Sequence, residues 1–371
     1  MLSLLPHLLT LATAVAGEIF HNVTVFEPPS EWVSHNTSYA RTVLLEHGRR
    51  HLEDPVLLST WSFWPPEGPY LPIYRSINGG RSWSDYSRVY FTHRNYTGGN
   101  IWQPFLYELP QRVGEYPQGT ILASGNAIPE DASSTNIELY ASLDRGFSWE
   151  FVSVVATGGP PNTTNGATPV WEPFISMYKD ILTVYYSDQR DPLHGQKLAH
   201  QSTQDLIHWG PIINDAADAN YTLRPGMTTI AQLGNGKYIL SYELANSQET
   251  DYAVHYRIAD SPLEFDRARP HLLRSQDGTI PSACPYTVWT PIGGPHGTIV
   301  LSDGTHTEVF INRENGDPRA WLKVPTDHGV AYSRSLTVLP DPNIILFFNG
   351  GRYNESETAV TAGEWIVPRH I

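Results

Sequence analysis

The sequence predicts an all-β protein, a six-bladed β-propeller, from a repeated short pattern, the spacing of its copies and the composition. The pattern Ser-x-Asp/Asn-x-Gly-x-Ser-Trp occurs at 76–83 and again at 142–149. An Asp or Asn followed by Gly is typical of a tight hairpin turn, in which the Gly takes a positive φ, and the Trp can pack beneath the turn. One copy would be an ordinary hairpin, whereas two indicate a repeat.

Weaker copies continue the repeat. The segment 201–209 keeps a Ser, an Asp and the Trp, and 259–265 keeps only the final aromatic residue, so the closing aromatics stand at 83, 149, 209 and 265. About six units of this size fill the chain, as in a propeller. With 29 Gly, 30 Pro and 12% aromatic residues among 371, the composition suits a large, turn-rich β-core, and no long stretch has helical periodicity.

The N-terminus predicts a secreted protein. Residues 1–17 are Leu-rich and end in Ala14-Val15-Ala16, which is typical of a signal peptide cleaved after Ala16 or Gly17, although no Lys or Arg precedes the apolar run. We expect residues 18–371 to form one propeller domain. The apolar run within residues 1–17 is too short to span a bilayer, and no later apolar run is long enough. Six glycosylation sequons fit a secretory route. They are Asn22, Asn36, Asn95, Asn162, Asn220 and Asn354.

Net charge and cysteine content limit the kinds of ligand and cofactor that we expect. A net charge of −14 argues against nucleic acid and favours a neutral partner. The His residues show no zinc-site spacing, and Cys284 is the only cysteine, so we expect no metal, no cofactor and no intrachain disulfide. Cys284 itself is expected to be a small buried strand residue. We further expect a monomer that does not bind membranes.

Each repeat offers a first strand that lines the propeller axis and a second strand that returns antiparallel to it. The start of the first strand and the end of the second then lie on one face of the propeller. The first strands are expected to begin at Arg41, Gln103, Glu172, Arg224, Cys284 and Arg334. The second strands are expected to end at Trp61, Gly125, Tyr186, Glu243, Asp303 and Asn349. The last blade is expected to be completed by a strand near 21–26, by one near 364–367, or by both.

Two glutamates on that face suit hydrolysis of a glycosidic bond. We expect the carboxyl groups of Glu172 and Glu243 to lie about 5 to 6 Å apart across the mouth. Arginines nearby would keep Glu172 ionised as the nucleophile, and partial burial would keep Glu243 protonated as the general acid/base. The alternative for any one position is a solvated rim residue or a structural ion pair.

The turns resemble the Asp boxes of the sialidase superfamily, and the detailed pattern is similar to the fungal exo-arabinanases of glycoside hydrolase family 93. The segments Trp171-Glu172-Pro173-Phe174, Ser241-Tyr242-Glu243-Leu244 and Ala331-Tyr332-Ser333-Arg334-Ser335-Leu336 carry the resemblance. It implies a six-bladed propeller that releases arabinobiose from the non-reducing end of linear α-1,5-L-arabinan with retention, using Glu172, Glu243 and Tyr332. The residues expected to bind the substrate are Arg41, Trp61, Trp64, Trp102, Gln103, Trp171, Tyr186, Arg224, Asp303 and Arg334.

Two other functions stay open. An exo-sialidase would use Tyr332 as nucleophile and an arginine triad, for which Arg41, Arg224 and Arg334 are available. Against this, 39–42 does not read aromatic-Arg-Ile-Pro, and the loop 61–68 lacks the expected Asp and looks like an aromatic platform for a neutral sugar. A non-catalytic carbohydrate-binding propeller would keep the aromatic rim and need neither glutamate.

Overall fold

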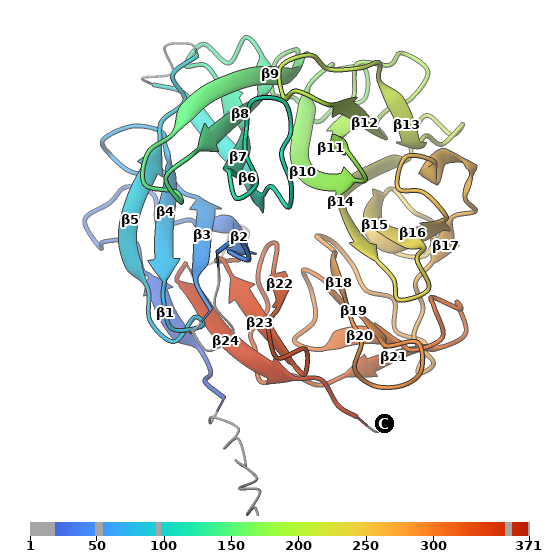
Figure 1. The fold of residues 1–371 in the computed structure, drawn as a ribbon. Helices are drawn as coiled ribbons and strands as arrows, with labels where there is room; N and C mark the ends of the chain where they lie inside the picture. The colour runs from blue at the N-terminus through green and yellow to red at the C-terminus, as the bar shows by residue number, and fades with distance from the viewer. Residues whose placement is uncertain (1–18, 49–54, 94–97, 353–357, 370–371) are drawn as a thin grey trace, which may run out of the picture.

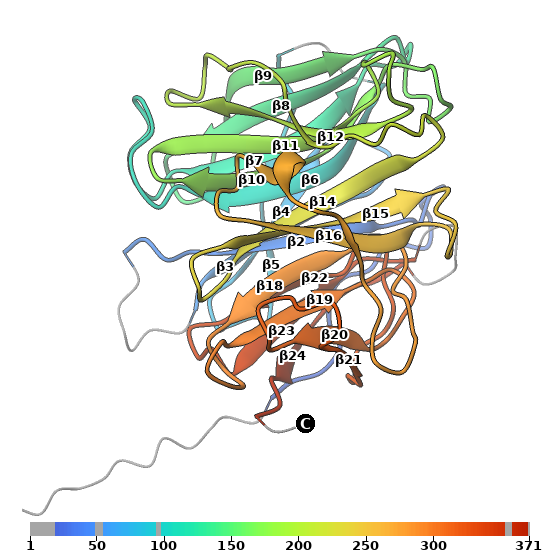
Figure 2. The ribbon, with the colours of Figure 1, turned by 90° about the vertical axis from the view of Figure 1, so that its right-hand side faces the viewer.

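The protein is a six-bladed β-propeller, as the sequence predicts (Figure 1). The structure is a computed structural model that describes residues 19–48, 55–93, 98–352 and 358–369. The predicted signal peptide at 1–17 and the sequons at Asn95 and Asn354 lie outside the described residues. Six four-stranded antiparallel sheets surround a central axis, and seen from the side they lie face to face (Figure 2).

Each sheet forms one blade, and the strands of each blade are given below from the one nearest the axis outward. Blade 1 contains β2 (Ser38–Leu44), β3 (Leu57–Ser62), β4 (Leu71–Ser76) and β5 (Ser84–Val89). Blade 2 contains β6 (Asn100–Glu108), β7 (Ile121–Ile128), β8 (Thr135–Ser142) and β9 (Glu150–Gly158). Blade 3 contains β10 (Val170–Tyr178), β11 (Ile181–Asp188), β12 (Lys197–Thr203) and β13 (Ile213–Ala216). Blade 4 contains β14 (Arg224–Gln232), β15 (Tyr238–Ala245), β16 (Ala253–Ala259) and β17 (His271–Leu272). Blade 5 contains β18 (Tyr286–Thr290), β19 (Thr298–Ser302), β20 (Val309–Asn312) and β21 (Trp321–Val324). Blade 6 contains β22 (Ser335–Val338), β23 (Ile344–Asn349), β24 (Val360–Ile366) and β1 (Val23–Phe26).

Both chain ends complete blade 6. Strand β1 lies outermost in that blade and pairs antiparallel with β24, with Val23 opposite Ala362 and Thr24 opposite Thr361. The two terminal segments that the sequence offers for closure are therefore both used. Because the protein has a single cysteine, which is free and buried, this backbone pairing closes the ring without a disulfide.

The repeated turns connect the third and fourth strands of blades 1 to 3. In blade 2, Oδ1 of Asp144 accepts hydrogen bonds from the Ser142 hydroxyl at 2.8 Å and from the Ser148 N–H at 2.8 Å. The Ser142 hydroxyl oxygen in turn accepts from the Gly146 N–H at 2.7 Å. Blade 5 has a related turn that the sequence pattern did not show, because Asn312 replaces the Ser and its Oδ1 accepts from the Gly316 N–H at 2.9 Å.

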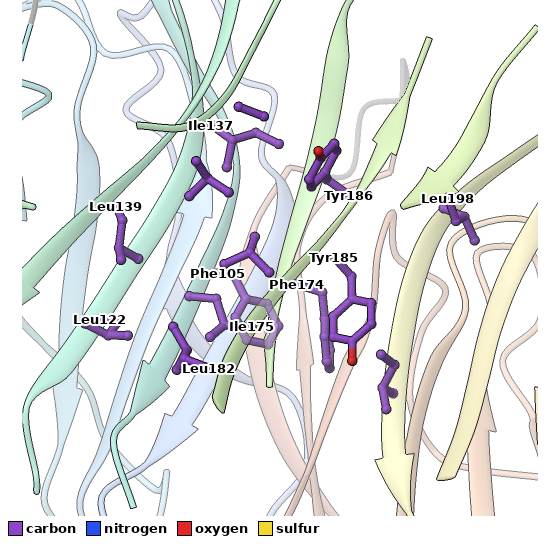
Figure 3. Packing of buried hydrophobic residues seen from close by; sticks show 14 of the residues in the cluster. Phe105, Leu122, Ile137, Leu139, Phe174, Ile175, Leu182, Tyr185, Tyr186 and Leu198 are labelled. Atoms are coloured by element: carbon purple, nitrogen blue, oxygen red, sulfur yellow. The ribbon is translucent and has the colours of Figure 1, made fainter. Parts of the chain in front are cut away.

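Apolar side chains fill the space between neighbouring blades. Between blades 2 and 3, Phe105 and Phe174 pack with ring centroids 4.6 Å apart, and Leu122 and Leu182 are fully buried in the same cluster (Figure 3). Within the described ranges, no helix is long and apolar enough to cross a membrane. The short 3₁₀-helix η1 (Phe265–Arg267) stands where the fourth copy of the repeat ends.

We expect Asp144→Ala to destabilise the fold without affecting the site, because Asp144 is the acceptor that organises its turn. Losing these hydrogen bonds lowers the free energy of unfolding by about 1–2 kcal/mol. Urea denaturation of the variant measures the loss. The control is Asp85→Ala, which removes only an exposed ion pair with Arg88. Such a pair contributes about 0–1 kcal/mol to the free energy of unfolding. Equal stability losses in the two variants would contradict this role of the turn.

Candidate active site

The innermost strands of five blades share one backbone irregularity at the mouth of the propeller. Strands β2, β6, β10 and β14 each contain a β-bulge at this end. The residue at the bulge, or just before β18 in blade 5, has a left-handed backbone that is strained for any residue but Gly. These residues are Tyr39 (φ 51°), Gln103 (56°), Glu172 (64°), Met227 (53°) and Cys284 (47°).

The bulges form a chain of hydrogen bonds around the mouth, because each left-handed residue donates its backbone N–H to the preceding blade. Met227 donates to Oε2 of Glu172 at 2.8 Å, and Cys284 donates to Oε2 of Glu243 at 2.8 Å. Glu172 itself donates to Oε1 of Gln103 at 3.0 Å. One oxygen of each glutamate is thus held by the neighbouring blade. The chain continues from Gln103 to Ser62 Oγ and from Tyr39 to the Tyr332 carbonyl.

The bulges also correct the predicted alignment of the first strands. Gln103 and Glu172 are equivalent to Tyr39 and Met227, whereas Arg41 lies two residues after Tyr39 and Arg224 lies three residues before Met227. The predicted second strands are also misaligned, by one residue. The bulges of blades 1, 3 and 4 face Trp61, Tyr186 and Tyr242, so these three residues are equivalent. Glu243 lies one residue further on, and a shift of one residue moves a side chain to the opposite face of a strand.

The carboxyl groups of Glu172 and Glu243 face each other across Gly226. A β-carbon placed on Gly226 would lie 3.4 Å from Oε1 of Glu243 and 3.5 Å from Oε2 of Glu172. These two oxygens are therefore at most about 7 Å apart, which is close enough for both groups to act on one glycosidic bond.

Charge and hydrogen bonding separate the two glutamates. Burial raises the pKa of Glu172, but hydrogen bonds from the Ser187 hydroxyl and the Met227 N–H, and the charges of Arg224 and Arg41, oppose that rise. Burial and the negative charge of Glu172 raise the pKa of Glu243 to about 8. The Cys284 N–H opposes this second shift, whereas Asp251 adds to it. These neighbours favour the negative charge on Glu172 and the proton on Glu243.

Tyr332 lies beside the pair as a neutral phenol. Burial, with the neighbouring Tyr39 next in importance, raises its pKa well above the ordinary value. The two tyrosine hydroxyl oxygens are 3.4 Å apart, and the Tyr39 hydroxyl also accepts from Nε2 of Gln103 at 3.3 Å. Tyr39 therefore links Tyr332 to the residue that holds the Glu172 backbone.

The glutamates lie in the wall of a cavity of about 750 Å³. Three tryptophans supply its aromatic surface: Trp64 and Trp102 have ring centroids 6.3 Å apart, and Trp102 and Trp171 are stacked at 6.5 Å. Arg224 reaches the cavity between Gln189 and Gln196, to whose Oε1 atoms its Nη2 donates at 3.0 and 2.8 Å. The predicted site residues that line this cavity are Trp64, Trp102, Gln103, Trp171, Glu172, Arg224, Glu243 and Tyr332.

Five predicted substrate-binding residues lie elsewhere. Trp61 and Tyr186 are fully buried between blades, on the strand face opposite to the one that carries Glu243. Asp303 is buried and accepts from the Ser282 N–H and the His306 ring. Arg334 is also fully buried, and its guanidinium donates to the carbonyl oxygens of 307, 308 and 329.

Arg41 lies beneath the cavity, in a narrow space that it shares with Glu172. Its Nη1 donates to Oγ of Ser333 at 2.8 Å and to the carbonyl oxygen of Ala40 at 3.0 Å. It therefore acts on Glu172 through its charge and does not line the substrate cavity.

The sequence reasoning missed several residues of the cavity wall. Tyr39 lies two residues before the expected strand start, and Gln196, Asp251 and Tyr252 lie in segments that the strand alignment did not include. The predicted alignment put Arg41 in the place of Tyr39, whereas no motif marked the other three.

Four predicted sequons can be placed. Asn22, Asn36, Asn162 and Asn220 have exposed side chains, and Asn36 lines the cavity. Their glycosylation stays a prediction. In the part of the chain that the structure describes, no three His, Cys, Asp or Glu side chains are grouped so as to hold a metal ion.

We expect Gly226→Ala to impair catalysis more than stability. The added methyl group would lie 3.1 Å from Nε2 of Gln196 and would touch the carboxyl groups of Glu172 and Glu243. We predict at least a tenfold loss in kcat/KM, since about 1.4 kcal/mol of lost transition-state stabilisation gives that factor. Steady-state kinetics and thermal unfolding measure the two effects. Gly329→Ala is the matched control, because a β-carbon there has no neighbour within 4 Å. Wild-type kinetics for Gly226→Ala would contradict the geometry.

Comparisons with known proteins find similar chains among solved structures. No family model and no curated protein matches the chain. Among solved structures, the family 93 α-L-arabinofuranosidase of Fusarium graminearum with arabinobiose is 42% identical, with a TM-score of 0.88. The α-L-arabinanase of Penicillium chrysogenum with arabinobiose is 40% identical, with a TM-score of 0.88. Each match covers 94% of this chain and 98% of the other.

A sialidase of Streptococcus pneumoniae shares the fold alone. It is 10% identical with a TM-score of 0.61, and the match covers 93% of this chain and 70% of the sialidase. The propeller is therefore sialidase-like. Identity of 40–42% over nearly the full length of both chains is a much closer relationship. The chain belongs to glycoside hydrolase family 93.

Proposed function

We propose that this protein is an exo-α-1,5-L-arabinanase that releases arabinobiose from the non-reducing end of linear arabinan with retention of configuration. The observation that carries the proposal is the pair Glu172 and Glu243, whose facing oxygens are within about 7 Å in an aromatic cavity. The two family members described above were solved with arabinobiose. The aromatic wall supports a neutral sugar, because ring faces pack against C–H faces.

In the proposed mechanism the two carboxyl groups divide the chemistry. Protonated Glu243 gives its proton to the glycosidic oxygen as the bond to the anomeric carbon breaks, and ionised Glu172 attacks that carbon to form a glycosyl ester. Glu243 then removes a proton from water, which attacks the same carbon and releases Glu172. The Ser187 hydroxyl and the Met227 N–H hold Oε2 of Glu172 throughout.

The arginines argue against a sialidase. A carboxylated sugar needs several cations that converge on its carboxylate, yet Arg41 and Arg334 donate to protein oxygens outside the cavity. Only Arg224 of the three lines the cavity. Tyr332 is neutral and buried, which does not favour a phenolate nucleophile.

Location and assembly are part of the proposal. The leader-like segment at 1–17 and the exposed sequons support a secreted protein. We propose that it acts as a monomer, without a nucleic-acid or membrane partner, since the net charge of −14 disfavours polyanions.

The direct test is to incubate the protein with linear α-1,5-L-arabinan and, separately, with a sialoside. We expect arabinobiose as the first product by chromatography, and no release of sialic acid, because Arg41 and Arg334 do not line the cavity and cannot join Arg224 in binding a carboxylate. Glu172→Gln and Glu243→Gln should each abolish hydrolysis while binding persists. Hydrolysis of the sialoside alone would favour the sialidase. Binding without hydrolysis by the wild type would favour a non-catalytic propeller.

The pH dependence of kcat/KM tests the acid role of Glu243. Its pKa is raised to about 8, so the protonated acid is present below that pH and is lost as the pH rises through it. We therefore expect an alkaline limb near pH 8 in kcat/KM, which reports the free enzyme. Asp251→Asn should move this limb to lower pH, because it removes a negative charge that raises the pKa. A profile that is flat to pH 10 would exclude Glu243 as the acid.

Trapping the intermediate with a slow fluorinated substrate tests the nucleophile. We expect the label on Glu172, because that carboxylate receives two hydrogen bonds and two positive charges. Tyr332→Phe should slow turnover without moving the label, as its hydroxyl only supports the site. Peptide mapping by mass spectrometry reads the labelled residue. A label on Glu243 would reverse the two roles, and one on Tyr332 would overturn the mechanism.

A further inference from the structure

A second cavity, here called the lateral cavity, lies on the other face of the strand that carries Glu243. Its volume is about 400 Å³, and Tyr242 and Leu244 of β15 line it. Because successive side chains of a strand point to opposite faces, Glu243 between them faces the catalytic cavity. Strand β16 contributes His255 and Arg257, also two residues apart. Strand β15 is thus a partition between the two cavities.

One residue, Asn246, lines both cavities. Its Nδ2 donates to the Thr222 carbonyl at 2.8 Å, and its N–H donates to Oδ1 of Asp251 at 2.9 Å. Thr222 lines the lateral cavity and Asp251 lines the catalytic one. The two cavities therefore adjoin at Asn246, which is hydrogen-bonded to a lining residue of each, so one extended ligand can contact both.

The lining of the lateral cavity suits a neutral polyhydroxylated ligand. The His255 ring stacks on Tyr242 with centroids 5.8 Å apart, and burial lowers its pKa, so the imidazole is uncharged near pH 7. The rim carries the carboxylates of Asp218 and Glu249, which repel anions and accept hydrogen bonds from hydroxyl groups. Arg257 directs Nη1 to the carbonyl oxygens of 265, 266 and 268.

We propose that the lateral cavity binds a second segment of the same neutral polysaccharide whose end is cleaved between Glu172 and Glu243. This inference rests on the proposed function, because it takes its ligand from that activity. An exo-acting enzyme holds only the chain end in its catalytic cavity, and a second site on the other side of a shared wall retains the rest of the chain. The lateral cavity therefore lowers KM for polymer and leaves short oligosaccharides unaffected.

The test compares His255→Ala with a matched variant, His271→Ala. His271 stacks on Tyr256 at 5.3 Å in the same blade, burial also lowers its pKa, and it does not line the lateral cavity. Kinetics are measured on linear arabinan and on arabinotriose, with protein produced without N-glycans because Asn220 of a sequon lines the cavity. We expect His255→Ala to raise KM for arabinan about three- to tenfold, as loss of one ring contact would, with arabinotriose kinetics unchanged. His271→Ala should match the wild type on both substrates.

A second pair of variants guards against misfolding. Glu249 and Glu264 are exposed glutamates that each accept one side-chain hydrogen bond, from Ser247 and Arg267, and only Glu249 lines the lateral cavity. Glu249→Gln should weaken retention of the inactive Glu172→Gln protein on arabinan in affinity electrophoresis, and Glu264→Gln should not.

The outcomes separate the two proposals. A wild-type protein that does not hydrolyse arabinan refutes the proposed function and this inference with it. Normal hydrolysis with an unchanged KM for arabinan in His255→Ala overturns the inference alone. An equal rise in KM for arabinotriose also overturns the inference, because it would mean that the substitution acts through Tyr242 on the strand that carries Glu243.

Discussion

The site depends on one interaction, the hydrogen bond from a left-handed bulge residue of one blade to a side chain of the blade before it. Met227 and Cys284 hold Oε2 of Glu172 and of Glu243 in this way. A non-Gly residue with a positive φ costs about 1–3 kcal/mol, and it persists only where its surroundings favour it. Here the bulge directs the N–H toward the preceding blade, so the groups that link neighbouring blades at the mouth also position the two carboxylates.

The second consequence of this arrangement is electrostatic. Two carboxyl groups that share one buried space cannot both be ionised at low cost. The structure breaks their symmetry by giving Glu172 the Ser187 hydroxyl and the charges of two arginines, while Glu243 faces Glu172 and Asp251. Different neighbours thus give two chemically identical side chains different tendencies to hold a proton, which is what distinguishes an acid from a base within one site.

The arginines show how the same fold serves a different substrate charge. Arg334 and Arg41 point into the protein, where carbonyl and hydroxyl oxygens receive their N–H groups. Arg41 still acts through space on Glu172. Trp64, Trp102 and Trp171 line the cavity instead, so aromatic faces are available to a neutral sugar where Arg41 and Arg334 do not reach.

The sequence by itself determined the six-bladed propeller, because the Asp-box turns and the apolar strands are local patterns that repeat along the chain. It also indicated that Glu172 and Glu243 stand at strand ends on one face of the fold. It did not determine which strand-end side chains face the cavity. Trp61 and Tyr186 were expected beside Glu243, yet they align with Tyr242 and are buried. Only the tertiary structure decided this, because side chains alternate between the two faces of a strand, so an offset of one residue in aligning the blades moves a side chain to the other face, and the true register is set by pairing between strands.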